Sequence, residues 1–129
     1  MPLKNIAVKG CRLRTKHGDP TTETIEITQQ ESTLVKCDGK AAYIKMSFTV
    51  SGYKGGAIER DGQGQGEIKA SSIYCKIENM PAFLEGDESD GGGTETDISI
   101  WGPNPAGTIV EEKDTVYIDY AGQSKCKGM

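Results

Sequence analysis

The sequence predicts a single all-β domain of repeated β-hairpins, folded as a β-sandwich or as a wrapped, pseudo-symmetric β fold. Three observations support this fold class. Polar and apolar residues alternate in many short stretches, and turn-forming residues separate these stretches. In addition, one hairpin-like sequence pattern occurs more than once. No long window keeps the i, i+3, i+4, i+7 apolar spacing of an amphipathic helix. A chain of 129 residues has the usual length of one domain, so we expect residues 1–129 to form a single unit.

The expected strands follow the alternation along the chain. They are rich in β-branched and aromatic residues, which fit a pleated, half-buried surface. They comprise residues 22–28, 43–50, 72–77, 96–101 and 115–120. The turns expected between them comprise residues 17–20, 38–39, 78–79 and 102–107. The Asp-Gly pair at 38–39 predicts a two-residue hairpin turn, because both residues tolerate a positive φ.

Two longer stretches are expected to be loops. Residues 52–69 are rich in glycine, but the alternating glycines at 62, 64 and 66 are followed by no helix and therefore do not predict a nucleotide site. Residues 85–97 concentrate carboxylates in a solvated acidic loop. Calcium is the alternative there, although the order of residues does not fit an EF-hand. We expect a partner to contact these loops through Arg60, Asp61, Asp87, Glu88 and Asp90.

The repeat is the most informative pattern. Residues 32–45 and 71–85 share a small polar residue, a strand, a lysine, a tight turn and a second strand. Residues 121–129 restate the first half, with the Lys-Cys-Lys-Gly of 125–128 aligned to the Lys-Cys-Asp-Gly of 36–39. Repeats of this kind predict similar hairpins around one core.

Composition excludes some partners. The net charge of −4 and the pI near 5.0 argue against nucleic acid, because neutralising phosphates needs a basic surface. No stretch is long and apolar enough to insert into a membrane. No signal peptide is visible, so we expect synthesis in the cytoplasm without a cleaved leader.

The four cysteines and the single histidine are the candidate metal ligands. Because no C-x-x-C pair occurs and no export signal is visible, we expect reduced thiols that pack inward and no bound cofactor. A zinc site is the alternative, drawn from His17, Cys11, Cys37, Cys75 and Cys126. No pattern of a nucleophile beside a base is present. Catalysis is therefore the less favoured interpretation.

Four phrases together resemble the PAAR and PAAR-like proteins, which cap the spikes of contractile injection systems and phage tails. They are "HGDPTTETIEI" (17–27), "DGKAAYIK" (38–45), "ENMPAFLEGD" (78–87) and "GTIVEEKDTVYID" (107–119). The resemblance implies a β-structural part that docks on a trimeric spike and becomes part of a virion or secretion apparatus. The family binds a metal through histidines and a cysteine, and His17 is the one histidine here.

The residues and the resemblance together predict a non-enzymatic structural or assembly protein, a spike-tip or tail-associated component. Its expected partner is another protein, or further copies of this chain. Two alternatives remain open. One is a stand-alone β-sandwich binding module of phage or bacterial origin. The other is a small or self-processing hydrolase, in which an Asp or Asn carbonyl reacts with a lysine.

Overall fold

A computed structural model describes residues 3–129, apart from the side chain of Gln29, and this part of the chain contains strands but no helix. The strands are β1 (Lys4–Asn5), β2 (Arg12–Thr15), β3 (Thr24–Cys37), β4 (Lys40–Gly55), β5 (Ile58–Glu67), β6 (Lys76–Ile77), β7 (Met80–Pro81), β8 (Asp97–Pro103), β9 (Ile109–Tyr120) and β10 (Lys127–Gly128). The prediction of a small all-β domain is confirmed. None of the described residues forms a helix that could cross a membrane.

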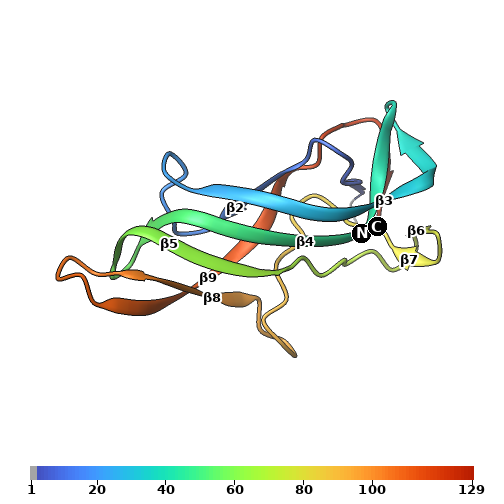
Figure 1. The fold of residues 1–129 in the computed structure, drawn as a ribbon. Helices are drawn as coiled ribbons and strands as arrows, with labels where there is room; N and C mark the ends of the chain where they lie inside the picture. Colours follow the sequence, from blue (N-terminus) through green and yellow to red (C-terminus); the bar gives the residue numbers. More distant parts are fainter. Residues whose placement is uncertain (1–2) are drawn as a thin grey trace.

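Six strands form one antiparallel sheet in the order β2-β9-β8-β5-β4-β3. This sheet curls into a nearly closed, barrel-like shape, which we call the curled sheet (Figure 1). It therefore differs from the two stacked layers of a sandwich. Its edge strands, β2 and β3, are not paired with each other. The backbone N–H of Thr15, at the end of β2, donates a hydrogen bond to Oε1 of Glu23, the residue before β3, at 3.3 Å.

Strand β5 corrects the expectation of a loop over 52–69. This region holds the end of β4, a tight turn and β5. The glycines of β5 face the interior, where a Cβ on Gly62 would lie 2.8 Å from Tyr53 Cβ and a Cβ on Gly66 would lie 3.1 Å from Phe48 Cζ. Gln63 and Gln65 alternate with them and are exposed. Glycine occupies the inward positions of a strand here because large neighbours leave no room for a side chain.

The molecule has two apolar cores. The interior of the curled sheet holds the larger core, and burial of each large side chain there is worth about 1.5–3 kcal/mol. Its most buried members include Met46, Phe48, Val50, Tyr53, Ile58, Ile100, Val116 and Ile118. The smaller core comprises Ile6, Val8, Cys37, Ala42, Ile77, Ala82 and Leu84.

The smaller core lies within what we call the hairpin end, which comprises residues 3–9, 32–45, 71–85 and 121–129. Strands β1 and β10 and the β6–β7 hairpin lie there, whereas the β4–β5 and β8–β9 turns lie at the opposite end (Figure 1). The N-terminal segment 3–9 contacts all three repeats. Its bridges and strand pairs are Val8 with Ala42, Ile6 with Leu84, and Lys4 with Gly128.

The first two repeats form the same tight hairpin. Cys37 pairs with Lys40 and Ile77 pairs with Met80, so each turn has two central residues. All four central residues have a positive φ: 54° at Asp38, 76° at Gly39, 51° at Glu78 and 66° at Asn79. These are the features of type I′ hairpin turns, and the two-residue turn predicted at Asp38-Gly39 is confirmed. The strand expected over 72–77 is shorter than predicted, because β6 begins only at Lys76.

Candidate functional site

Near the start of each repeated segment, a polar side chain caps a turn. The capping oxygen accepts a hydrogen bond from the backbone N–H three residues later, as Ser, Thr and Asn side chains do in local turns. The acceptor and donor residues are Ser32 with Val35 (2.9 Å), Ser72 with Cys75 (3.0 Å) and Gln123 with Cys126 (2.7 Å). The three segments therefore share one local structure.

The shared cap fixes how the third repeat aligns with the others. The sequence alignment places Cys126 opposite Cys37, but counting from the caps places Cys126 opposite Val35 and Cys75. This alignment brings three exposed lysines to one position, Lys36, Lys76 and Lys127. The residues that follow these lysines are all buried, and they are Cys37, Ile77 and Gly128.

The three segments surround the N-terminal segment and contact one another. A disulfide between Cys37 and Cys126 joins the first segment to the third. Ser72 Oγ donates to the backbone carbonyl of Met129 at 2.9 Å and joins the second to the third. Strand β4 contacts β6 and thus brings the first segment to the second. The hairpin end is accordingly a closed arrangement of three equivalent pieces of chain.

Exposed apolar side chains gather at this end. Two of them occupy equivalent positions, two residues after the caps: Leu34 is 79% exposed and Tyr74 is 76% exposed. Six of the nine large apolar side chains that are exposed in the described residues belong to the hairpin end, and they are Leu3, Leu34, Val35, Ile73, Tyr74 and Met80. A concentration of this kind marks an interaction surface more often than a solvated one.

Charge also separates the two ends of the molecule. The hairpin end carries eight lysines and three carboxylates, a net charge of +5. The rest of the chain carries seven basic and sixteen acidic residues, a net charge of −9, which together with the hairpin end gives the overall −4. An acidic partner surface would therefore be attracted to the hairpin end and repelled by the rest.

The cysteines depart in part from the expected reduced state. Cys37 and Cys126 are bonded, with 6.1 Å between their Cα atoms, a separation that a disulfide spans. Cys75 is free and half-buried beside them. Cys11 lies in the other core, where burial raises the pKa of its thiol from 9.0 to about 12. A thiol with so high a pKa is an inert packing group.

These positions do not bring the five candidate metal ligands together. Three cysteines lie at the hairpin end and Cys11 lies in the core of the curled sheet, whereas His17 lies in the exposed turn after β2. Among residues 3–129, no group of three or more His, Cys, Asp or Glu side chains is arranged to hold a metal ion.

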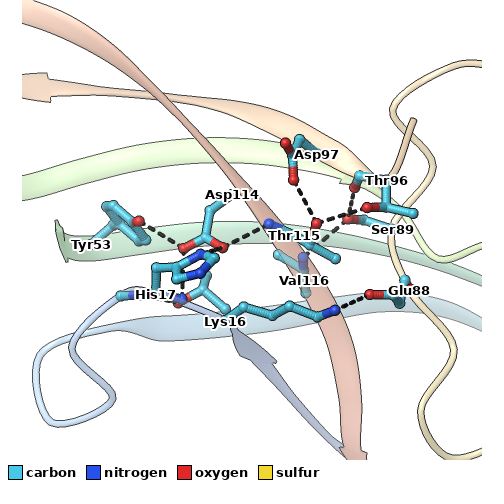
Figure 2. Close-up of polar contacts among 12 residues, drawn as sticks. Lys16, His17, Tyr53, Glu88, Ser89, Thr96, Asp97, Asp114, Thr115 and Val116 are labelled. Carbon is cyan, nitrogen blue, oxygen red and sulfur yellow. Dashed lines mark hydrogen bonds and ion pairs between the residues drawn. The ribbon is translucent and has the colours of Figure 1, made fainter. Parts of the chain in front are cut away.

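His17 instead contacts Asp114, a buried carboxylate that the sequence analysis missed (Figure 2). Asp114 accepts hydrogen bonds from Tyr53 Oη at 2.7 Å, from Thr115 N at 2.7 Å and from His17 N at 3.0 Å. Burial, followed by the bond to Asp114, raises the pKa of Tyr53, so the phenol remains a donor. The sequence could have indicated that Asp114 is buried, because side chains alternate between the two faces of a strand and Asp114 lies on the same face of β9 as the buried Val116 and Ile118.

The His17–Asp114 contact has the form of a base and its orienting carboxylate, with 3.1 Å between Nδ1 and Oδ1. In residues 3–129, however, no hydroxyl or thiol is hydrogen-bonded to this imidazole. The network instead ties the turn after β2 to β9. Every lysine of the chain is exposed, so the described residues also contain no buried lysine of the kind that a self-processing cross-link would use.

The five residues expected to contact a partner have different environments. Asp87 is buried and accepts hydrogen bonds from the backbone N–H groups of Ser71 (3.0 Å) and Leu84 (2.9 Å), so it is not part of a solvated loop. Glu88 forms an ion pair with Lys16 and is half-buried. The three that are exposed are Arg60, Asp61 and Asp90. Arg60 and Asp61 lie in β5, far along the chain from Asp90.

Comparison of this chain with family models, with curated proteins and with solved structures finds no match.

Proposed function

We propose that this chain is a non-enzymatic assembly protein that docks through its hairpin end on a trimeric partner, as a spike-tip or tail-associated component. The observation that carries the proposal is the set of three equivalent segments around the N-terminal segment. One chain that presents three similar pieces of structure can contact three identical subunits in similar ways, which matches one chain to a trimer.

The exposed side chains of the hairpin end support the same function. Protein interfaces are built around aromatic and apolar anchors with a polar rim. Leu34 and Tyr74 occupy equivalent positions and supply two such anchors. Lys36, Lys76 and Lys127 also occupy equivalent positions, and they supply a cation on each segment. The partner surface is expected to be apolar at its centre and acidic at its edge.

The test is a binding measurement with a trimeric spike protein, chosen by searching the genes that neighbour the gene of this chain. The two proteins are co-expressed and examined by native mass spectrometry. We expect one copy of this chain for each partner trimer. A different stoichiometry, or no complex at all, would contradict the proposal.

A matched pair of charge variants locates the contact. The first variant changes Lys36, Lys76 and Lys127 to glutamate. The second makes the same change at Lys54, Lys69 and Lys113, which are also exposed but lie outside the hairpin end. Both variants change the net charge by the same amount. We expect the first to weaken binding at least about tenfold, or 1.4 kcal/mol, and the second to have little effect. Equal losses would mean that only the overall charge matters.

A further inference from the structure

A second surface, outside the hairpin end, carries a different chemistry. The outer face of β3, β4, β5 and β8 is hollowed into a groove with a volume of about 700 Å³, within the range of about 300–1,000 Å³ that is usual for ligand sites. Its side chains are Glu26, Thr49, Ser51, Gln63, Gln65, Ser99 and Trp101. A second hollow of about 490 Å³ adjoins it and shares Thr49 and Gln65, so the two form one elongated groove.

The side chains of this groove lie in rows across the sheet, because directly paired residues point to the same face. One row runs from Glu26 through Thr49 to Gln65. In the next row, Gln63 pairs directly with Trp101. The groove therefore presents hydroxyl and amide groups in register, beside one indole ring.

Trp101 is the only tryptophan of the chain, and it is 52% exposed. A half-exposed indole offers a flat apolar surface and an N–H donor at its edge. About half of its surface is therefore open to a ligand. The amides of Gln63 and Gln65 and the hydroxyl of Thr49 are also exposed, and no hydrogen bond within the described part of the chain uses them.

Charge and backbone pairing narrow the kind of ligand. The only charged side chains that line the two hollows are the carboxylates Glu26 and Glu67, so an anionic ligand would be repelled. Strand β4 is paired with β3 on one side and with β5 on the other, so the middle of this face has no free strand edge on which a peptide could add. Side chains are therefore the groups that the middle of the groove offers to a ligand.

The groove is held in shape by the strand beneath it. The inward glycines of β5 allow it to approach Tyr53 and Phe48 closely, and this close packing fixes the outward direction of Gln63 and Gln65. A rigid sheet that presents side chains in register loses little conformational freedom when a ligand binds.

We propose that this groove binds a neutral oligosaccharide. A pyranose ring has an apolar C–H face that stacks on Trp101, and its hydroxyls both donate and accept hydrogen bonds. Gln63, Gln65 and Thr49 provide the complementary donors and acceptors. The length of the groove, along two adjoining hollows, accommodates several sugar units rather than one. This site is independent of the proposed docking through the hairpin end.

The single tryptophan makes the test direct, since all indole fluorescence comes from Trp101. The protein is titrated with cellohexaose, mannohexaose, maltohexaose and N-acetylchitohexaose, which include extended and helical chains and β- and α-linkages. We expect a saturable blue shift of the emission with at least one of them, because stacking removes water from the indole. A heparin-derived hexasaccharide serves as the anionic comparison, and we expect it to bind less tightly.

Variants connect the signal to the groove. By isothermal titration calorimetry, we expect Trp101→Ala to abolish binding and Gln63→Ala to weaken it about tenfold, as the loss of a hydrogen bond does. Tyr120→Ala removes an exposed aromatic ring outside the groove and should bind as the unaltered protein does. The proposal is overturned if none of the four neutral hexasaccharides binds, if the heparin fragment binds more tightly, or if Trp101→Ala retains full affinity. It is also overturned if Trp101 mediates association between copies of the chain, measured by analytical ultracentrifugation.

Discussion

Replacing Gly62 with alanine perturbs the closest inward contact of β5. The new Cβ would lie 2.8 Å from Tyr53 Cβ and 2.9 Å from the Tyr53 carbonyl oxygen, which belongs to the backbone and has little freedom to move. Overpacking of this kind costs about 1–3 kcal/mol. Alanine also makes the unfolded chain less flexible than glycine does, which raises the free energy of unfolding by about 0.5–1 kcal/mol. The difference lies between about 0 and 2.5 kcal/mol, and because one of the opposing atoms is a backbone oxygen that cannot move aside, we expect a net loss of about 1–2 kcal/mol in the free energy of unfolding.

The assay is thermal and urea denaturation followed by circular dichroism. For a domain of this size, a loss of 1 kcal/mol lowers the Tm by roughly 3–5 °C, so we expect a decrease of about 3–10 °C. Gln63→Ala is the matched control in the same strand. Its side chain points outward, so it should change the free energy of unfolding by less than about 0.5 kcal/mol. If the glycine variant is as stable as this control, β5 does not pack as described.

Three further predictions concern the interior. In urea titrations, Asp114→Ala should lower the free energy of unfolding by about 3–5 kcal/mol, because it leaves several buried donors unpaired. Tyr53→Phe removes one of these hydrogen bonds and should lower it by about 1.5–3 kcal/mol. A loss below about 1 kcal/mol for Asp114→Ala would contradict this role. Replacing both Cys37 and Cys126 with alanine should lower the free energy of unfolding by about 2–4 kcal/mol, since the disulfide closes a long loop. Calorimetry with and without a reducing agent measures this: the agent should destabilise the unaltered protein and leave the double variant unchanged. Stability should also fall in alkali, because burial raises the folded-state pKa of Cys11 from 9.0 to about 12. The contribution of Cys11 to the free energy of unfolding is complete below pH 9 and decreases by roughly 1 kcal/mol by pH 10, as the thiol of the unfolded chain ionises. Urea titrations at pH 8 and 10 measure this decrease, and Cys11→Ala should make it smaller.

Local patterns in the sequence predicted much of the fold. The alternation at 43–50 and 115–120 lies within β4 and β9, and Asp38-Gly39 forms the turn expected of it. These features depend on neighbouring residues and on the period of a strand, both of which can be read along the chain. The strand at β5 was missed, because glycine at its inward positions removes the apolar signal by which strands are recognised.

The contacts between distant segments could not be predicted in this way. Cys37 and Cys126 are 89 residues apart, and both pack in the smaller core with Ile6 and Val8 of the N-terminal segment. The network around Asp114 likewise joins β9 to residues of β4 and of the turn after β2. Spacing along the sequence carries no information about such pairs until the order of strands in the sheet is known.

The pairing of β1 with β10 has a consequence for how the molecule forms. The contact between Lys4 and Gly128 costs less conformational entropy once the chain between them is ordered, and contacts of such long separation are slow to form. The adjacent hairpins β3–β4 and β4–β5 are expected to assemble early, and the hairpin end last. Pulsed alkylation during refolding from the reduced state measures this order: Cys37 should stay reactive after Cys11 is protected. The hairpin end, through which we propose docking, would then be the last part of the protein to fold. A partner that meets the chain during folding would find the curled sheet already formed and the docking surface still incomplete.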